Sequence, residues 1–190
     1  MVEARAAFRE AAAAVPPDAF VFLDESGITT ALVRRYARAE GGRRAVGRVP
    51  AGHWTQLTVL GALSLAGLGA CMTVNAPTDR DVFTAFVRHV LAPTLRPGQV
   101  VVLDNLNAHK TAAARALIEG AGCRLLYLPP YSPEFNPIEQ AWSKLKTLLR
   151  GAAARTREAL EAALKGFLDR ITPADARGWF AHAGYRAAPN

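Results

Sequence analysis

The chain has 190 residues, with 23 Lys and Arg against 16 Asp and Glu, which gives a formal net charge of +7. This length suits one domain, and a hydrophobic share of 51% with a charged share of 21% argues for a folded core and against intrinsic disorder. The two cysteines, Cys71 and Cys123, suggest neither a disulfide framework nor a zinc site.

Two segments bear on whether the protein is soluble. Residues 1–19 carry charges throughout and do not resemble a signal peptide. Residues 57–74 contain no charged residue and reach the lower length limit of a membrane span. Three glycines interrupt this segment, however, and two strands over 55–65 and 68–75 are the preferred interpretation. The sequence therefore predicts a cytoplasmic protein with no membrane partner.

The remaining elements alternate between strands and helices. In chain order we predict a helix over 3–14, a strand over 20–25, the hairpin, a helix over 78–91, a strand over 99–104, a helix over 110–120, a strand over 124–128, and helices over 137–150, 155–170 and from 172 onward. This order predicts an α/β fold with a mixed five-stranded sheet and helices on both faces. Right-handed crossovers would place the strands that end in Asp24 and Asp104 side by side.

The positive charge is concentrated in one segment. Residues 34–48 hold six arginines and one glutamate, so most of the net charge of +7 lies there. Such a segment, with Tyr36 inside it, suggests a polyanionic partner. A solvated loop that charge keeps soluble is an equally simple interpretation, and the composition alone leaves both open.

Three acidic residues stand out by their positions. Asp24 and Asp104 each follow an apolar strand, and Glu139 lies in the first turn of a predicted helix. Each has a structural explanation: the aspartates could turn or cap the chain, and Glu139 could complete a capping box with Asn136 as N-cap and Pro137 at N1. Together they could hold Mg²⁺ or Mn²⁺, and two ions roughly 3.5–4 Å apart would serve an in-line phosphoryl displacement.

The helix that contains Glu139 has two distinct faces. A polar face, which could follow a nucleic-acid backbone or be simply solvated, comprises Glu139, Ser143, Lys146 and Arg150. An apolar face, which should pack on the sheet, comprises Ile138, Trp142, Leu145 and Leu149.

At these acids the sequence resembles a known family. The strings VFLDES (21–26), VVLDNLNAHK (101–110) and LPPYSPEFNPIEQAWSKLK (128–146) are similar to the three catalytic motifs of DDE transposases in the mariner superfamily, and most of all to the bacterial insertion-sequence 630 group. The 34 residues between Asp104 and Glu139 match the spacing of that group. The resemblance covers about residues 19–185.

The resemblance implies an RNase H-like fold in which Asp24, Asp104 and Glu139 bind metal, with Asp24 bridging two Mg²⁺ or Mn²⁺ ions. It implies strand cleavage at transposon ends, followed by attack of the freed 3′-hydroxyl on target DNA, usually at a TA dinucleotide. Supporting roles are expected for Asn105, His109 and Asn136. Glu25 is not expected among the ligands because it should point away from Asp24, and neither is Glu134, which lies outside the family position.

The chain departs from the family at its start. Residues 1–18 are expected to be a helical extension and residues 19–190 the catalytic domain, which leaves no room for the family's helix-turn-helix region. A separate helix-turn-helix partner or a missing N-terminal region would supply that region, and a homodimer is also compatible with the family. The expected partners are transposon-end and target DNA, in the bacterial nucleoid. The residues expected to contact DNA are Arg34, Arg35, Arg43, Arg44, Lys146 and Arg150.

Two other functions remain open from the sequence. The first is a nuclease of the same fold that cuts DNA without joining it. The second is a DNA-binding or assembly module in which the acids no longer act.

Overall fold

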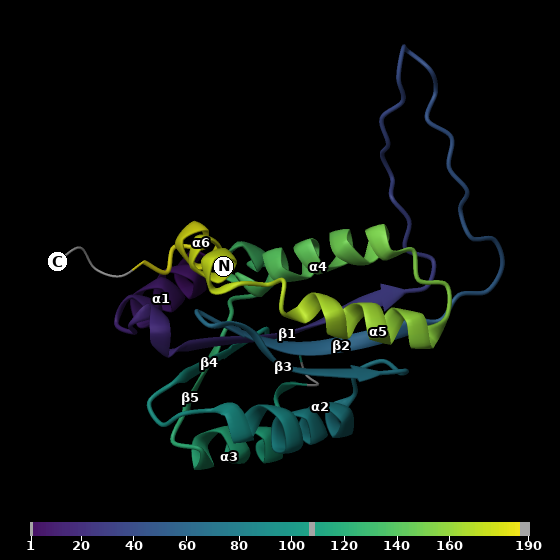
Figure 1. Ribbon diagram of the computed structural model, residues 1–190. Helices are drawn as coiled ribbons and strands as arrows, with labels where there is room; N and C mark the ends of the chain where they lie inside the picture. Colours follow the sequence, from purple (N-terminus) through teal and green to yellow (C-terminus); the bar gives the residue numbers. More distant parts are fainter. Residues whose placement is uncertain (1, 107–108, 187–190) are drawn as a thin grey trace.

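The computed structural model describes residues 2–106 and 109–186. Its centre is a five-stranded sheet in the order β3-β2-β1-β4-β5 (Figure 1). Strand β1 (Phe20–Thr29) pairs antiparallel with β2 (Gln56–Ser64) and parallel with β4 (Val100–Leu103). Strand β3 (Gly67–Val74) is antiparallel to β2, and β5 (Arg124–Tyr127) is parallel to β4. The predicted mixed sheet is confirmed, with the strands that carry Asp24 and Asp104 adjacent at its centre.

Helices cover both faces of the sheet (Figure 1). One face carries α1 (Val2–Ala13), α4 (Ile138–Ala152), α5 (Arg157–Leu168) and α6 (Pro173–His182). The other carries α2 (Arg80–Phe86) and α3 (Ala112–Gly120). A π-helical turn (Val87–Leu91) continues α2. Each face has its own apolar core, and β1 contributes to both because successive side chains alternate.

Strand β1 is longer than predicted. It continues to Thr29 because β2 supplies antiparallel partners as far as Gln56, whereas its pairing with β4 ends at Phe22. Asp24 therefore lies inside a strand, opposite Gly61, and not at a strand end. It still lies just past the last β1 residue that pairs with β4, at the edge where Asp104 follows that strand.

The N-caps of α6 and α2 show where these two helices begin. The helix predicted from 172 onward begins there, and Thr172 and Asp175 form a capping box with proline in the first turn. At α2 the N-cap is Asp79 and not Thr78, and its carboxylate accepts from the backbone N–H groups of Asp81 and Val82 at 3.0 and 2.8 Å. The helix consequently begins at Arg80.

The uncharged segment 57–74 forms the β2–β3 hairpin, as predicted. Across residues 2–106 and 109–186, no helix is long and apolar enough to span a membrane.

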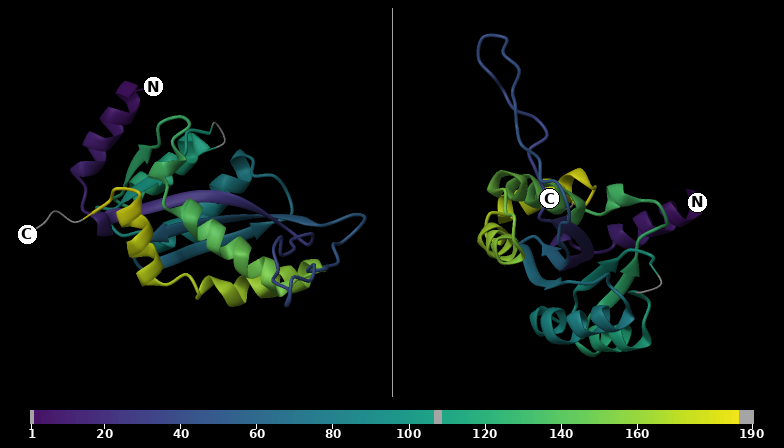
Figure 2. Two further views of the ribbon diagram at one scale, coloured as in Figure 1. Left: turned by 90° about the horizontal axis from the view of Figure 1, so that it is seen from above. Right: turned by 90° about the vertical axis from the view of Figure 1, so that its right-hand side faces the viewer.

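The first residues of the chain join the main core. Phe8, Ala12 and Val15 are buried in the same cluster as the inner face of α4. Helix α1 and the segment after α6 lie together at one end of the sheet (Figures 1 and 2).

Residues 31–55, called the arm here, connect β1 to β2 and project far from the sheet (Figure 2). No helix or strand is assigned to them. The base of the arm is closed by a backbone hydrogen bond from Thr30 to Thr55 at 3.0 Å. Arg155 also donates to the carbonyl oxygens of Thr30 and Leu32 at 2.9 and 3.0 Å.

Candidate active site

A cavity of about 420 Å³ opens where β1, the end of β4 and the start of α4 meet. The three predicted acids, Asp24, Asp104 and Glu139, all line it, and so do Asn105 and Asn136. Residues more than a hundred positions apart are thus brought to one place by the sheet order and by the loop that precedes α4.

Asp24 is the most buried of the three acids. Its Oδ1 accepts from the backbone N–H of Glu25 at 2.8 Å, and its Oδ2 accepts from Nδ2 of Asn136 at 3.4 Å. Burial raises the pKa of Asp24 to about 7, and the negative charges of Glu139 and Asp104 add to the rise. The cavity therefore holds mutually repelling carboxylates, a situation that a cation would relieve.

A glycine, Gly61, lies opposite Asp24 on β2 and makes room for the side chain of Trp142. A Cβ on Gly61 would lie 2.7 Å from Cη2 of Trp142, so the indole can pack on the sheet only because residue 61 lacks a side chain.

Asp104 is held by its own turn and by a histidine. Its Oδ1 accepts from the backbone N–H of Leu106 at 3.1 Å, which is the turn-forming role considered above, and lies 2.5 Å from Nδ1 of His109. Both contacts use the same oxygen. His109 is 3% exposed, and its ring lies against Phe83 with the two centroids 4.4 Å apart.

Glu25 lies on the opposite sheet face from Asp24, but it is not isolated from the site. Its Oε2 is 3.8 Å from Nε2 of His109, so the imidazole lies between Glu25 and Asp104. Burial acts to lower the pKa of His109, but the hydrogen bonds and charges of Asp104 and Glu25 outweigh it and raise the pKa to about 9. The ring thus favours its cationic form, with Nδ1 hydrogen-bonded to Asp104 and Nε2 within ion-pair distance of Glu25.

Glu139 does not form the capping box that was its alternative explanation. The N-cap of α4 is Pro137, without a side-chain cap, and the Asn136 side chain reaches Asp24 instead. Asn136 is buried, whereas Glu139 is exposed at the cavity. The buried face of α4 is the predicted one, with Ile138, Trp142, Leu145 and Leu149.

The donor chemistry of the cavity suits a hard divalent cation, since three carboxylates line it. The side chains are not gathered into a finished coordination sphere. No three Asp, Glu, His or Cys side chains of residues 2–106 and 109–186 lie close enough to hold one metal ion.

A second cavity, of about 860 Å³, lies at the other end of α4. Four arginines line it, together with the aromatic rings of Tyr36 and Phe167. None of the four forms an ion pair with a carboxylate in the described residues. They come from the arm, from the end of α4 and from just after α5, and are Arg34, Arg35, Arg150 and Arg170.

The other residues predicted to contact DNA lie elsewhere. Arg43 and Arg44 are exposed on the projecting arm, and Lys146 is half-buried on α4 between the two cavities. Arg170 was missed by the sequence analysis, because only the packing of α5 against α4 brings it near Arg150. Tyr131 was also missed. It lines the first cavity, is 90% exposed and has a φ of 54°, and its position between two prolines was a signal of an unusual turn.

Most of the chain is similar to a known protein family. A family model described as DDE superfamily endonuclease matches residues 19–161. No curated protein sequence gives a significant match.

Solved structures share the fold at low identity. The Mos1 transposase paired-end complex with the left transposon end has a TM-score of 0.76 and 13% identity, over 95% of this chain and 56% of that one. The catalytic domain of Mos1 mariner transposase has a TM-score of 0.65 and 12% identity, over 96% and 85%. A simian T-cell lymphotropic virus intasome in complex with PP2A regulatory subunit B56 gamma has a TM-score of 0.53 and 14% identity, over 92% and 58%.

The likeness to the Mos1 catalytic domain confirms the RNase H-like fold. The chain spans little more than half the length of the first of these proteins.

Proposed function

The chain belongs to the DDE superfamily of endonucleases, and we propose that it is the catalytic domain of a DNA transposase in the mariner superfamily, of the bacterial insertion-sequence 630 group. It cleaves DNA at transposon ends and joins the freed ends to target DNA. The observation that carries this proposal is the single cavity lined by Asp24, Asp104 and Glu139. The motif strings and the 34-residue spacing support the group assignment.

In this proposal the three acids hold two Mg²⁺ or Mn²⁺ ions. The raised pKa of Asp24 supports it, because cations would offset the burial and repulsion that now disfavour the ionised carboxylate. Mos1 paired-end complexes have been solved with Mg and with Mn. Such ions supply activation of a water and stabilisation of the leaving oxygen in phosphodiester cleavage.

The surrounding residues hold the acids in place. Asn136 donates to Asp24, and His109 donates to Asp104, so each aspartate keeps one oxygen fixed by a neighbour. Asn105 is exposed at the cavity and can donate its amide hydrogens to a phosphate. These contacts are the supporting roles that we assign to the three residues.

Cleavage and joining are the same displacement with different nucleophiles. In cleavage, a water loses a proton and its oxygen bonds to phosphorus, the bond from phosphorus to the 3′ oxygen breaks, and that 3′ oxygen takes a proton. In joining, the 3′-hydroxyl loses its proton and bonds to a target phosphorus, and the displaced 3′ oxygen of the target strand takes a proton. One P–O bond forms and one breaks each time, so no oxidant or external energy source is required.

The DNA interface that we propose combines the arm with the polar face of α4. The second cavity, called the cationic cavity here, is lined by Arg34, Arg35 and Arg150. The contact would be extended along the arm and the helix by Arg43, Arg44 and Lys146. Transposon ends and target DNA are the partners, in the bacterial cytoplasm and at the nucleoid. A homodimer and a helix-turn-helix region, in another chain or in a longer form of this one, would supply recognition of the ends.

A strand-transfer assay tests the proposal. A labelled, pre-cleaved DNA end is incubated with supercoiled plasmid and Mn²⁺, with wild-type protein and with Asp104→Asn. Joined products in the wild type alone support the transposase. Nicked plasmid without joined products identifies the nuclease alternative.

A binding measurement addresses the remaining alternative. DNA affinity is titrated with Mg²⁺ or Mn²⁺ for wild type and Asp104→Ala. Equal binding in both proteins without metal dependence, together with no cleavage, identifies the inactive DNA-binding or assembly module. Binding that tightens with metal in the wild type alone supports the catalytic assignment.

A further inference from the structure

The loop before α4 carries the residues that complete the cavity. Tyr131, Ser132, Pro133 and Asn136 line it on one side. Asn136 reaches Asp24, and Glu139 follows in the first turn of the helix. The position of these groups depends on how the loop is held from its other side. That side faces the two ends of the chain.

Helix α1 contacts the loop through two arginines: Arg5 makes the polar contacts, and the guanidinium carbon of Arg9 lies 5.1 Å from the ring centroid of Phe135. Nη1 of Arg5 donates to Oγ of Ser132 at 3.1 Å, and Nη2 pairs with the carboxylate of Glu134. The guanidinium carbon lies 4.9 Å from the ring centroid of Phe135. One side chain therefore contacts three residues of the loop.

Phe8 adds an apolar contact from the same helix. Its ring stacks on that of Phe135, with centroids 5.4 Å apart and an angle of 17° between the planes. Phe8 is also part of the main core, so it accounts for the docking of α1 without Arg5. The polar contacts of Arg5 go to Ser132 and Glu134 of the loop.

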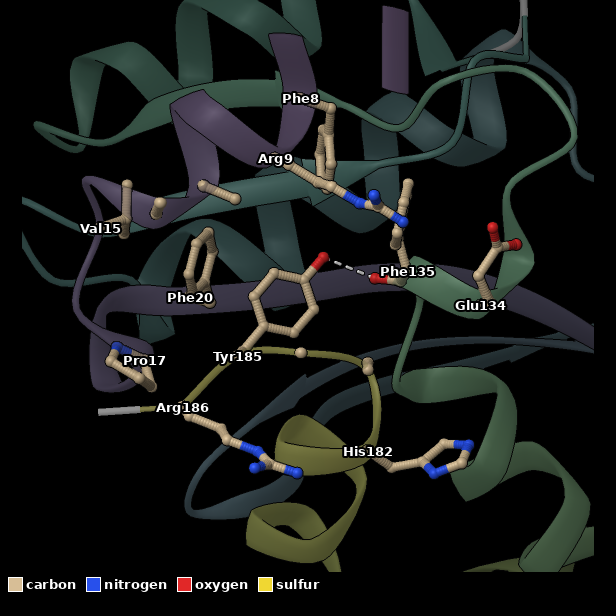
Figure 3. A pocket seen from close by; sticks show the side chains of 14 residues that line it. Phe8, Arg9, Val15, Pro17, Phe20, Glu134, Phe135, His182, Tyr185 and Arg186 are labelled. Carbon is tan, nitrogen blue, oxygen red and sulfur yellow. Dashed lines mark hydrogen bonds between the residues drawn. The ribbon is translucent and has the colours of Figure 1, made fainter. Parts of the chain in front are cut away.

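The segment after α6 holds the same loop from a second direction. The hydroxyl of Tyr185 donates to the carbonyl oxygen of Phe135 at 2.6 Å in a buried position (Figure 3). The Tyr185 ring packs on Phe20 and Phe22 of β1, with centroids 5.0 and 4.8 Å apart. Tyr185 thus connects the loop to the strand that carries Asp24.

Few other groups support this part of the loop. A cavity of about 580 Å³ lies between α1, Tyr185 and the Glu134–Phe135 turn, and its lining includes Arg9 and Arg186 (Figure 3). Because open space borders the loop here, the individual contacts of Arg5 and Tyr185 have a larger share in fixing it than contacts in a filled core would have.

We propose that Arg5 and Tyr185 are positioning residues for the active site. They hold residues 132–136 so that Asn136 stays against Asp24 and Glu139 stays at the cavity, and they touch neither the acids nor the DNA. This inference rests on the proposed function for its effect on catalysis. Its effect on the loop does not depend on that function.

Two variants and a matched control test it. Arg5→Ala removes the contacts to Ser132 and Glu134, and Tyr185→Phe removes only the hydroxyl. The control Arg157→Ala removes a similar exposed pair, with Glu161 at 2.9 Å, from the surface of α5. Hydrogen exchange, thermal unfolding, DNA affinity and the single-turnover rate of Mn²⁺-dependent nicking are measured for each.

Arg5→Ala and Tyr185→Phe should each raise amide exchange at least tenfold within residues 131–140 and leave other peptides unchanged. The nicking rate should fall about tenfold at saturating DNA, because a small displacement of Asn136 and Glu139 disturbs the reacting geometry. DNA affinity should not change. The melting temperature of Arg5→Ala should fall by less than about 4 °C, since exposed ion pairs contribute little to stability. Arg5→Lys, which keeps the charge facing Glu134, should restore part of the rate and of the protection.

Other outcomes overturn the proposal. Exchange in residues 131–140 that matches wild type in both variants would show that the loop is held without these residues. Exchange that rises throughout the protein, together with a large drop in melting temperature, would show a purely structural role. If wild-type protein shows no nicking, the proposed function fails, while the exchange result still decides whether the two residues hold the loop.

Discussion

The side-chain amide of Asn136 lies 3.4 Å from Oδ2 of Asp24, a residue 112 positions earlier in the chain. This contact explains why α4 begins without a side-chain cap: the asparagine that would provide one is turned to the acidic cavity. It also ties the loop before α4 directly to the central strand.

Replacing Asn136 with alanine should lower metal-dependent nicking by about 10- to 100-fold, the range found when a residue that orients a metal ligand is removed. The amount of Mn²⁺ needed for half-maximal rate should rise. Steady-state rates over a Mn²⁺ titration measure both. Asn75→Ala, the same substitution at an exposed position after β3, is the control. A rate and Mn²⁺ requirement equal to those of the control would contradict the role of Asn136.

Asp24→Asn should abolish nicking and yet stabilise the metal-free protein. The carboxylate is buried beside two other acids, whereas an uncharged amide of nearly the same shape avoids that repulsion. We expect a gain of about 1 kcal/mol, or roughly 2–4 °C in melting temperature for a chain of this size. Thermal unfolding in EDTA at pH 8 provides the measurement. A lower melting temperature than wild type would show that Asp24 is not under electrostatic strain.

Replacing Arg34, Arg35, Arg43 and Arg44 with alanine should weaken DNA binding and flatten its salt dependence. For every phosphate that the protein no longer neutralises, the slope of log K against log salt should fall by roughly one. The Arg34 and Arg35 pair should matter more, because these two share a cavity with Arg150. Arg88→Ala with Arg124→Ala removes the same charge as the Arg34 and Arg35 pair, from exposed positions outside the proposed interface. If the slope changes equally in this control, the arm is better interpreted as a solvated loop than as a DNA contact.

Acid stability should depend on Asp175. The hydrogen bond from Lys144, at 2.6 Å, and those from Thr172 lower the pKa of Asp175 to about 2, from 3.8 in the unfolded chain. A lowered pKa stabilises the folded protein above about pH 4, and this contribution is lost as the pH falls from 4 towards 2.

Asp175→Asn should therefore cost about 1 kcal/mol at pH 7 and show a smaller loss of stability between pH 4 and 2. Urea unfolding at a series of pH values tests this expectation. Parallel pH profiles for the variant and wild type would contradict it.

Most helices and strands of the fold could be predicted from the local sequence. The run Val101–Leu103 is apolar and rich in β-branched residues, and the Thr172–Asp175 box marks a helix start, so local composition indicates these elements. The three acids could be grouped from the sequence because each lies within or directly after an element that could be predicted.

The remaining features depend on tertiary partners that no local pattern contains. The length of β1 is set by β2, and the orientation of Asn136 by Asp24. Arg170 joins Arg150 only through the packing of α5 on α4, and Arg5 reaches Glu134 across 129 positions. Sequence spacing does not indicate these contacts. The three acids could therefore be predicted from the sequence, but the side chains that position them could not.

Helix α4 begins at the acidic cavity with Glu139 and ends at the cationic cavity with Arg150. With a rise of 1.5 Å per residue, the two Cα atoms are about 16 Å apart along its axis, which equals roughly five base pairs of duplex DNA. Inserting or deleting one residue within the helix would rotate one cavity by about 100° relative to the other. Length changes in this helix should therefore be far less tolerated than length changes in the arm, even where every side chain at both cavities is kept.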